Sequence, residues 1–187
     1  MKRTFFRLND EEEVPGRWHL GEVRTLAGEE PRLRAGLHFN GADRLVAGVS
    51  RAGRVLDFCL TSFAVPVASA ALARAVSEAA DGDVQCLPVE VASQAGMVVL
   101  NAVRVVRCLD ESNSEFIKWT AQDHRADLAG QYRQVTKLIL DEAAIPVDAH
   151  FFRVEGWLVA LIVSEQVKDA MERAGCRGAR FTEVMPR

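Results

Sequence analysis

The sequence predicts an α+β fold in which a mostly antiparallel sheet is accompanied by two main helices, at about residues 66–80 and 164–174. The run from Met97 to Cys108 is rich in valine and apolar on both faces, which is typical of a central strand that is covered on both sides. In each predicted helix, apolar residues recur at steps of three and four, a spacing that places them on one helical face. These residues are Ala68, Leu72, Val76 and Ala79 in the first helix and Val167, Ala170, Met171 and Ala174 in the second.

The N-terminal part is predicted to consist of short strands and loops that lead into the first helix. Two glycines and a proline interrupt Val14 to Glu22, so we expect a loop there. Pro66 fits the start of the helix, and Gly82 suits its end because glycine readily adopts the left-handed conformation. The strands expected before this helix cover residues 3–8, 37–39, 45–49 and 54–60.

The C-terminal part is predicted to be dominated by strands. Because Pro88 cannot donate a ladder hydrogen bond, we place the strand over residues 87–91 at a sheet edge. The polar stretch 121–131 is expected to be an exposed excursion, and Ser164 is a suitable N-cap for the second helix. The other elements are a short one at residues 116–119 and strands at 132–140, 151–154, 157–163 and 180–184.

A candidate boundary falls at Asp81 to Asp83, where the sequence "DGD" stops the first helix. It divides the chain into an N-terminal lobe, residues 1–82, with strands, loops and one helix, and a C-terminal α+β unit, residues 83–187. The two parts can also belong to one compact unit, since 187 residues suit a single domain. The sequence leaves the strand order and the oligomeric state open.

Charge and composition argue against nucleic acid and membranes as partners. The formal net charge is −3, whereas a nucleic-acid-binding domain is usually basic. The arginines at positions 32, 34, 44, 51 and 54 could meet phosphates, but Glu29, Glu30 and Asp43 dilute them. The Ala-rich run 63–80 is interrupted by charged residues and is too short to span a bilayer, and the first residues lack the apolar region of a signal peptide. We therefore expect a cytoplasmic protein.

Neither a metal site nor a cofactor site is predicted. The cysteines Cys59, Cys86, Cys108 and Cys176 have no C-x-x-C spacing, so we expect buried, reduced thiols. The histidines show no metal-binding spacing, and the chain has no glycine-rich phosphate loop.

One histidine leaves a catalytic interpretation open. His124 lies close to Asp123 and Asp127, and a histidine with a carboxylate partner can act as a base near neutral pH. The simpler interpretation is a solvated loop.

The three tryptophans differ in their surroundings. Trp157 lies within an apolar run and is expected in the core. Trp18 and Trp119 border polar loops, where an aromatic side chain either covers the core or forms an interaction hot spot. The candidates for contact with a partner are Trp18, His19, Trp119, Asp123, His124, Arg125 and Asp127.

An ordered series of segments resembles a known family. The segments, from Cys86 to Val184, are "LPVEV", "LNAVRVVRCLDE", "YRQVTKLILD", "HFFRVEGW", "LIVSEQVKDAMERAG" and "GARFTEV", and "GRWHLGE" at residues 16–22 is similar to the family's N-terminal segment. In this succession the chain resembles the immunity proteins of bacterial polymorphic toxin systems, a myxobacterial-type immunity domain formerly known as a domain of unknown function.

The resemblance implies a small cytoplasmic protein that binds a cognate toxin and neutralises it, with no catalytic residues and no cofactor. It also implies structural roles for several shared residues. These are Gly156 and Gly178 in turns, Trp157 and Phe181 in the core, and Asn101 and Arg153 as structural polar groups. A buried Asn101 needs partners, and we expect a hydrogen bond to a neighbouring loop.

Two other functions stay open at this point. The chain could be an intracellular adaptor or regulatory partner, for example of a protease or a chaperone, because an interaction surface alone would serve that role. It could also be an enzyme whose site uses His124 with Asp123 or Asp127.

Overall fold

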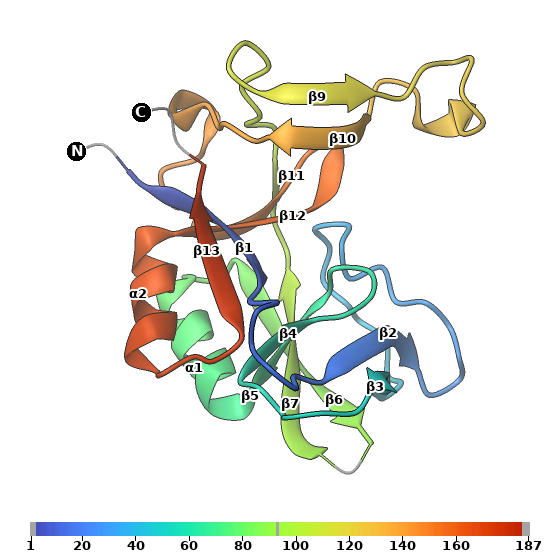
Figure 1. Ribbon diagram of the computed structural model, residues 1–187, viewed down its shortest axis with the longest axis vertical. Coiled ribbons are helices and arrows are strands. Elements are labelled where there is room, and N and C mark those ends of the chain that lie inside the picture. Colours follow the sequence, from blue (N-terminus) through green and yellow to red (C-terminus); the bar gives the residue numbers. More distant parts are fainter. Residues whose placement is uncertain (1–2, 93, 185–187) are drawn as a thin grey trace.

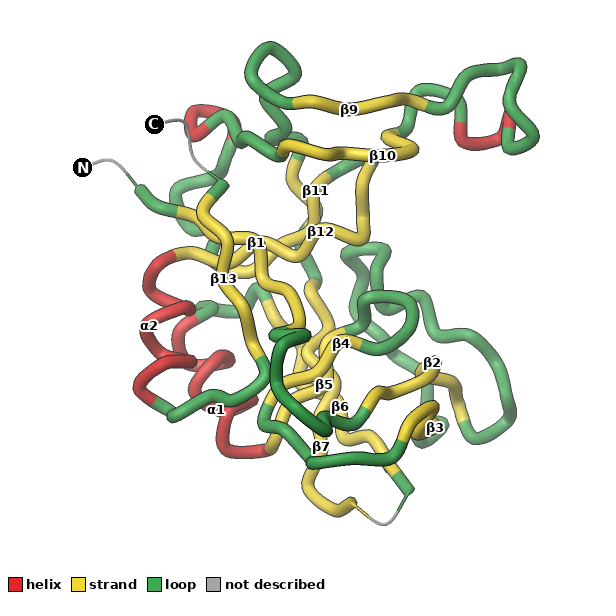
Figure 2. Tube along the Cα trace, viewed as in Figure 1, coloured by secondary structure: helices red, strands yellow, loops and turns green. Residues whose placement is uncertain are grey.

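A computed structural model describes residues 3–92 and 94–184, and these residues form an α+β fold that consists mostly of sheet (Figure 1; Figure 2). Within them lie a six-stranded sheet, a five-stranded sheet, a two-stranded arm and two α-helices. Most strand pairs are antiparallel, and two pairs, β3 with β6 and β8 with β11, are parallel. The predicted fold class is confirmed.

The six-stranded sheet has the order β2-β3-β6-β7-β5-β4. Its strands are β2 (His19–Thr25), β3 (Leu45–Arg51), β4 (Phe58–Leu60), β5 (Pro66–Ser69), β6 (Val84–Val91) and β7 (Gln94–Ala102). Strand β7 pairs with β6 on one side and with β5 on the other, so the valine-rich run does begin as a central strand. Two expectations are wrong: β2 starts at His19 inside the predicted loop, and residues 37–39 form no strand.

The five-stranded sheet has the order β13-β1-β12-β11-β8. Its strands are β1 (Phe5–Asp10), β8 (Val105–Val106), β11 (Phe151–Val154), β12 (Trp157–Ser164) and β13 (Ala179–Glu183). The valine-rich run was predicted as one strand, but it is divided between the two sheets. The Val103 N–H still donates to the Asp83 carbonyl at 2.9 Å, in register with the β6–β7 ladder. Beyond Val103 the chain leaves this sheet, and β8 pairs with β11.

The two helices are α1 (Ala70–Ala79) and α2 (Glu165–Arg173). Ser164 caps α2 as predicted, since its side chain accepts the backbone N–H of Val167. The predicted start of α1 at Pro66 is wrong. Residues 66–69 are strand β5, which pairs with β4 and β7, and Ser69 is the N-cap of the helix.

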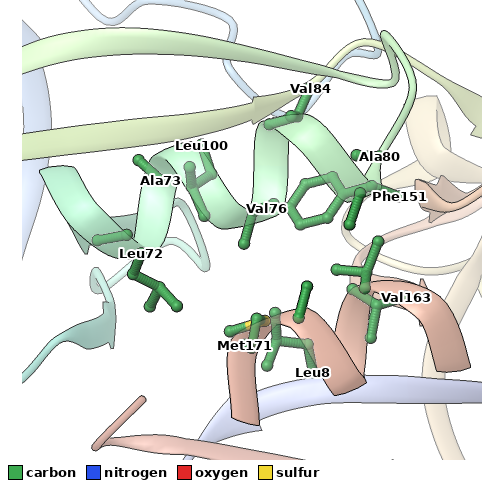
Figure 3. Packing of buried hydrophobic residues seen from close by; sticks show 14 of the residues in the cluster. Leu8, Leu72, Ala73, Val76, Ala80, Val84, Leu100, Phe151, Val163 and Met171 are labelled. Carbon is green, nitrogen blue, oxygen red and sulfur yellow. The ribbon is translucent and has the colours of Figure 1, made fainter. Parts of the chain in front are cut away.

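The largest core cluster lies between the helices and joins the two sheets (Figure 3). Val76 of α1 and Met171 of α2 are both fully buried in it. Leu100 of β7 and Val163 of β12 contribute from the six- and five-stranded sheets respectively. Burial of this apolar surface at about 25 cal/mol per Å² holds the two sheets and the helix pair together.

Both sheets use strands from both sides of the predicted boundary at residue 82. Strand β1 pairs with β12 and β13, while β6 and β7 pair with β3 and β5. The N-terminal lobe and the C-terminal unit therefore share their sheets.

Two local expectations need correction. Strand β6 is an interior strand, because β3 pairs with it from Val89 onward; Pro88 lies just before this pairing, so it interrupts no bond on that side. Cys59 and Cys108 are buried and Cys176 is half-buried, but Cys86 of β6 is exposed beside α1, with its Sγ 3.8 Å from the Ala73 carbonyl oxygen.

None of the helices in the described residues is long and apolar enough to cross a membrane.

Candidate functional site

A two-stranded arm projects from the body of the protein, at the top of Figure 1. It consists of β9 (Glu115–Lys118) and β10 (Tyr132–Lys137), joined by residues 119–131, which we call the tip loop. The rings of Phe116 and Tyr132 meet edge to face at 5.1 Å, and Lys118 Nζ lies 5.1 Å from the centre of the Tyr132 ring. One connection to the body is the Tyr132 N–H, which donates to the Gly156 carbonyl at 3.0 Å.

The tip loop is an exposed excursion, as the sequence predicted, and its ends are tied together. The backbone N–H of Trp119 donates to the Gln131 carbonyl and the N–H of Gly130 donates to the Trp119 carbonyl, both at 2.9 Å. Inside the loop, Asp123 accepts the backbone N–H and the hydroxyl of Thr120 at 2.8 and 2.9 Å. The loop is thus held in one shape although it is largely surrounded by solvent.

The tip loop brings together five of the seven residues predicted for partner contact. The Trp119 and His124 rings lie edge to face at 5.2 Å, and the guanidinium of Arg133 covers the Trp119 ring at 5.0 Å. Arg125 and Asp127 form a two-bond ion pair at 2.9 and 2.7 Å. An aromatic centre surrounded by charged groups resembles the centre and rim of a protein interface.

The carboxylates near His124 have other partners. Hydrogen bonds from Thr120 hold the pKa of Asp123 below its usual range, and the hydrogen bond from Arg125 does the same for Asp127. In the described part of the chain, no hydrogen bond joins His124 to either carboxylate. The arrangement that a histidine base would need is therefore not formed here.

Trp18 and His19 lie apart from the tip loop, at the start of β2. Trp18 is only 3% exposed and packs in a core cluster with Leu20 and Leu56, so its ring offers no surface to a partner. His19 is half-buried, and its carbonyl accepts the Ser50 hydroxyl at 3.1 Å. Trp18 is therefore not part of the exposed surface around the tip loop.

A groove of about 420 Å³ runs between the tip loop and the body. Several parts of the chain form its walls. The arm contributes Trp119, Leu128, Gln131 and Tyr132, and the turn between β4 and β5 contributes Phe63 and Val65. The other walls are Glu22 and Val23 of β2, residues 30–35, and residues 156–159 at the start of β12. Phe63 is 46% exposed and Val159 is 38% exposed, so the groove presents apolar side chains to solvent. Sequence reasoning missed this groove because its walls are far apart along the chain.

Arg153 of β11 joins two of these walls from behind. Its Nη1 donates to the Leu158 carbonyl at 3.0 Å and its Nη2 donates to the Ala64 carbonyl at 2.8 Å. Ala64 has a positive φ of 55°, an uncommon conformation for a residue other than glycine. The fully buried Arg153 therefore fixes the turn that carries Phe63, which agrees with the structural role that the resemblance implied.

Asn101 also has the predicted structural role. Its Nδ2 donates to the Leu37 carbonyl at 2.9 Å and to Gln85 Oε1 at 3.0 Å, and thereby ties the loop after residue 36 to β7.

Comparison with known proteins gives one family match. Residues 87–185, more than half of the chain, match the model of the Immunity protein family (Imm11). The matched range contains the whole arm, Arg153 and the 156–159 wall of the groove, whereas Arg34 and Phe63 precede it. A search of curated proteins gives no match.

Proposed function

The chain belongs to the immunity protein family Imm11, and we propose that it binds a cognate bacterial toxin and neutralises it by contact, without catalysing a reaction. The observation that carries the proposal is the family match over residues 87–185. The toxin-neutralising role is the common theme of such a family, and the arm supplies a surface suited to it.

The shape and chemistry of the arm favour protein contact. The internally bonded tip loop places Trp119 and His124 beside Arg125 and Asp127, and Arg133 of β10 covers the Trp119 ring. Tryptophan, tyrosine and arginine dominate the residues that contribute most to protein–protein affinity. Because the loop is tied at its base, little conformational entropy would be lost on binding.

A non-enzymatic role fits the state of His124. Its neighbouring carboxylates are bound to Thr120, Arg125 and Arg133 rather than to the imidazole. The proposal places the protein in the cytoplasm, where it would meet a toxin that acts inside the cell.

Co-expression and affinity capture test the proposal together. We expect the tagged chain to recover the product of the neighbouring gene at near one-to-one ratio and to protect cells that express that product. Recovery of only a protease or a chaperone, with no protection, would contradict the proposal and favour an adaptor role.

A substitution at the arm tests the proposed surface. Trp119→Ala is expected to weaken toxin binding by about thirtyfold, the loss of roughly 2 kcal/mol that is typical of an interface hot spot. Val147→Ala is the control, since Val147 is 85% exposed but does not line the groove. Equal affinities of the two variants and the unaltered protein would place the toxin on another surface.

A further inference from the structure

The groove has an excess of positive charge. Arg32 and Arg34 line it, and no carboxylate of the described residues forms an ion pair with either of them. Of the two acidic residues in its walls, Glu22 is already paired with Arg24, which leaves Glu30 as the acidic side chain that could offset the arginines.

A third positive charge lies behind the groove wall. Arg153 is fully buried, its hydrogen-bond acceptors are two neutral carbonyls, and its Nε has no partner in the described residues. Burial, together with the nearby positive charge of Arg34, lowers the pKa of Arg153 to about 9. A buried charge without a counter-ion is unfavourable, so an anion placed close to Arg153 and Arg34 would be stabilised.

The rest of the groove is apolar. Phe63 and Val159 are exposed in its walls, and Trp119 and Trp157 extend the apolar surface. The guanidinium of Arg34 lies over the Phe63 ring at 5.6 Å, so the positive charge and the aromatic surface are adjacent. A simple inorganic anion would leave this apolar surface unused, whereas an acidic residue between apolar neighbours would match both features.

We infer that the groove binds an acidic segment of the toxin, in which a carboxylate lies against Arg34 and apolar neighbours contact Phe63 and Val159. The inference rests on the proposed function and names the part of the toxin that this site recognises. The charge of Arg34 selects the segment, and Arg153 acts as a positioning residue because it holds the turn of Phe63 against the wall of Leu158.

The test uses short random peptides displayed on phage and selected on the full-length protein. We expect the selected peptides to carry Asp or Glu between apolar residues. The best peptide and its Asn or Gln analogue are then titrated by calorimetry against the unaltered protein and against Arg34→Glu and Arg34→Gln. Arg34→Glu is expected to lower the affinity for the acidic peptide by about tenfold or more. Added salt is expected to lower the affinity of the unaltered protein for the same peptide.

Arg74→Glu is the matched control, because Arg74 is an exposed arginine on α1 and is not part of the groove. It should leave the affinity for the peptide unchanged. Thermal unfolding of each variant checks that the fold is intact, and Arg34→Gln, which removes the charge without reversing it, should give an intermediate loss. Neutral or basic selected peptides, or equal binding by Arg34→Glu, would overturn the inference.

Competition links the peptide to the toxin. We expect the acidic peptide to displace the captured toxin from the protein. If the toxin is captured and protection is seen but the peptide does not displace it, the groove inference fails while the proposed function stands. If the peptide binds through Arg34 but neither toxin capture nor protection is seen, the proposed function fails, and the assignment of the segment to a toxin fails with it.

Discussion

The guanidinium Nε of Arg104 lies 2.6 Å from the buried carboxylate of Asp83. The same carboxylate accepts the backbone N–H groups of His150 and Phe151 at 2.6 and 3.2 Å. Asp83 thus fastens three segments: the end of α1, the crossing from β7 to β8, and the start of β11. This cluster holds the two sheets in place relative to each other.

Replacing Asp83 by Ala should destabilise the protein by about 3 kcal/mol, since it leaves buried donors without an acceptor. The measurement is the free energy of unfolding in urea. Asp148→Ala is the control. Asp148 also binds Arg104, but it is exposed, so its contribution to the free energy of unfolding should be much smaller. Similar losses in both variants would show that the buried position of Asp83 is unimportant.

Two substitutions of Arg153 should separate its charge from its packing. Arg153→Ala leaves a cavity and is expected to cost about 3 kcal/mol. Arg153→Met fills the same space and removes an uncompensated buried charge, so its net cost should be below about 1 kcal/mol. Chemical denaturation of both variants measures the difference, and a Met variant as unstable as the Ala variant would mean that the two carbonyl bonds dominate.

A methyl group at Gly178 should be poorly tolerated. Its φ is +103°, and an added Cβ would lie 2.3 Å from the Phe58 carbonyl oxygen. Gly82 is the matched control: its φ is +91°, but nothing lies within 4 Å of an added Cβ. We expect Gly82→Ala to cost about 1 kcal/mol and Gly178→Ala at least twice as much, as read from thermal melting. Equal melting temperatures would contradict the close approach of the backbone at residue 178.

Alkaline pH should destabilise the protein in part through Cys108. Burial, assisted by the charge of Asp141, raises the pKa of its thiol from 9.0 to about 12. The pKa of this thiol is higher in the folded than in the unfolded protein. The contribution of Cys108 to the free energy of unfolding is therefore fully present below pH 9 and is lost as the pH rises toward 12. Cys108→Val should therefore make the fall in unfolding free energy over this range less steep, by up to about 1.4 kcal/mol per pH unit. Parallel curves for the two proteins would contradict the raised pKa.

Elements whose formation depends on residues close in sequence could be predicted from the sequence. Helix α2 follows its N-cap Ser164 and ends one residue before the predicted Ala174, because capping and the apolar stripe are local features. The polar stretch 121–131 was correctly expected to be exposed. Where an element begins was less predictable: Pro66 suits a helix start, but pairing of residues 66–69 with two strands overrides that preference.

The candidate site was only partly predictable. The tip loop was identified because Trp119 and the polar segment 123–127, which holds two aspartates, a histidine and an arginine, are close in sequence. Trp18 looked similar in its local context but is buried among residues such as Leu56, which lies far along the chain. No sequence pattern indicated that Arg34 would lie over Phe63 and near Arg153.

The sequence by itself determined the α+β class, the two amphipathic helices, the central valine-rich strand and the exposed loop at Trp119. These follow from periodicity, capping and polarity, which act over a few residues. The tertiary structure alone decided that the valine-rich run divides between two sheets after Val103, where β8 pairs with β11, and that Arg153 joins two walls of a groove. Both depend on partners far along the chain, β11 and Ala64, and local pattern carries no information about which distant groups will satisfy a buried N–H or guanidinium.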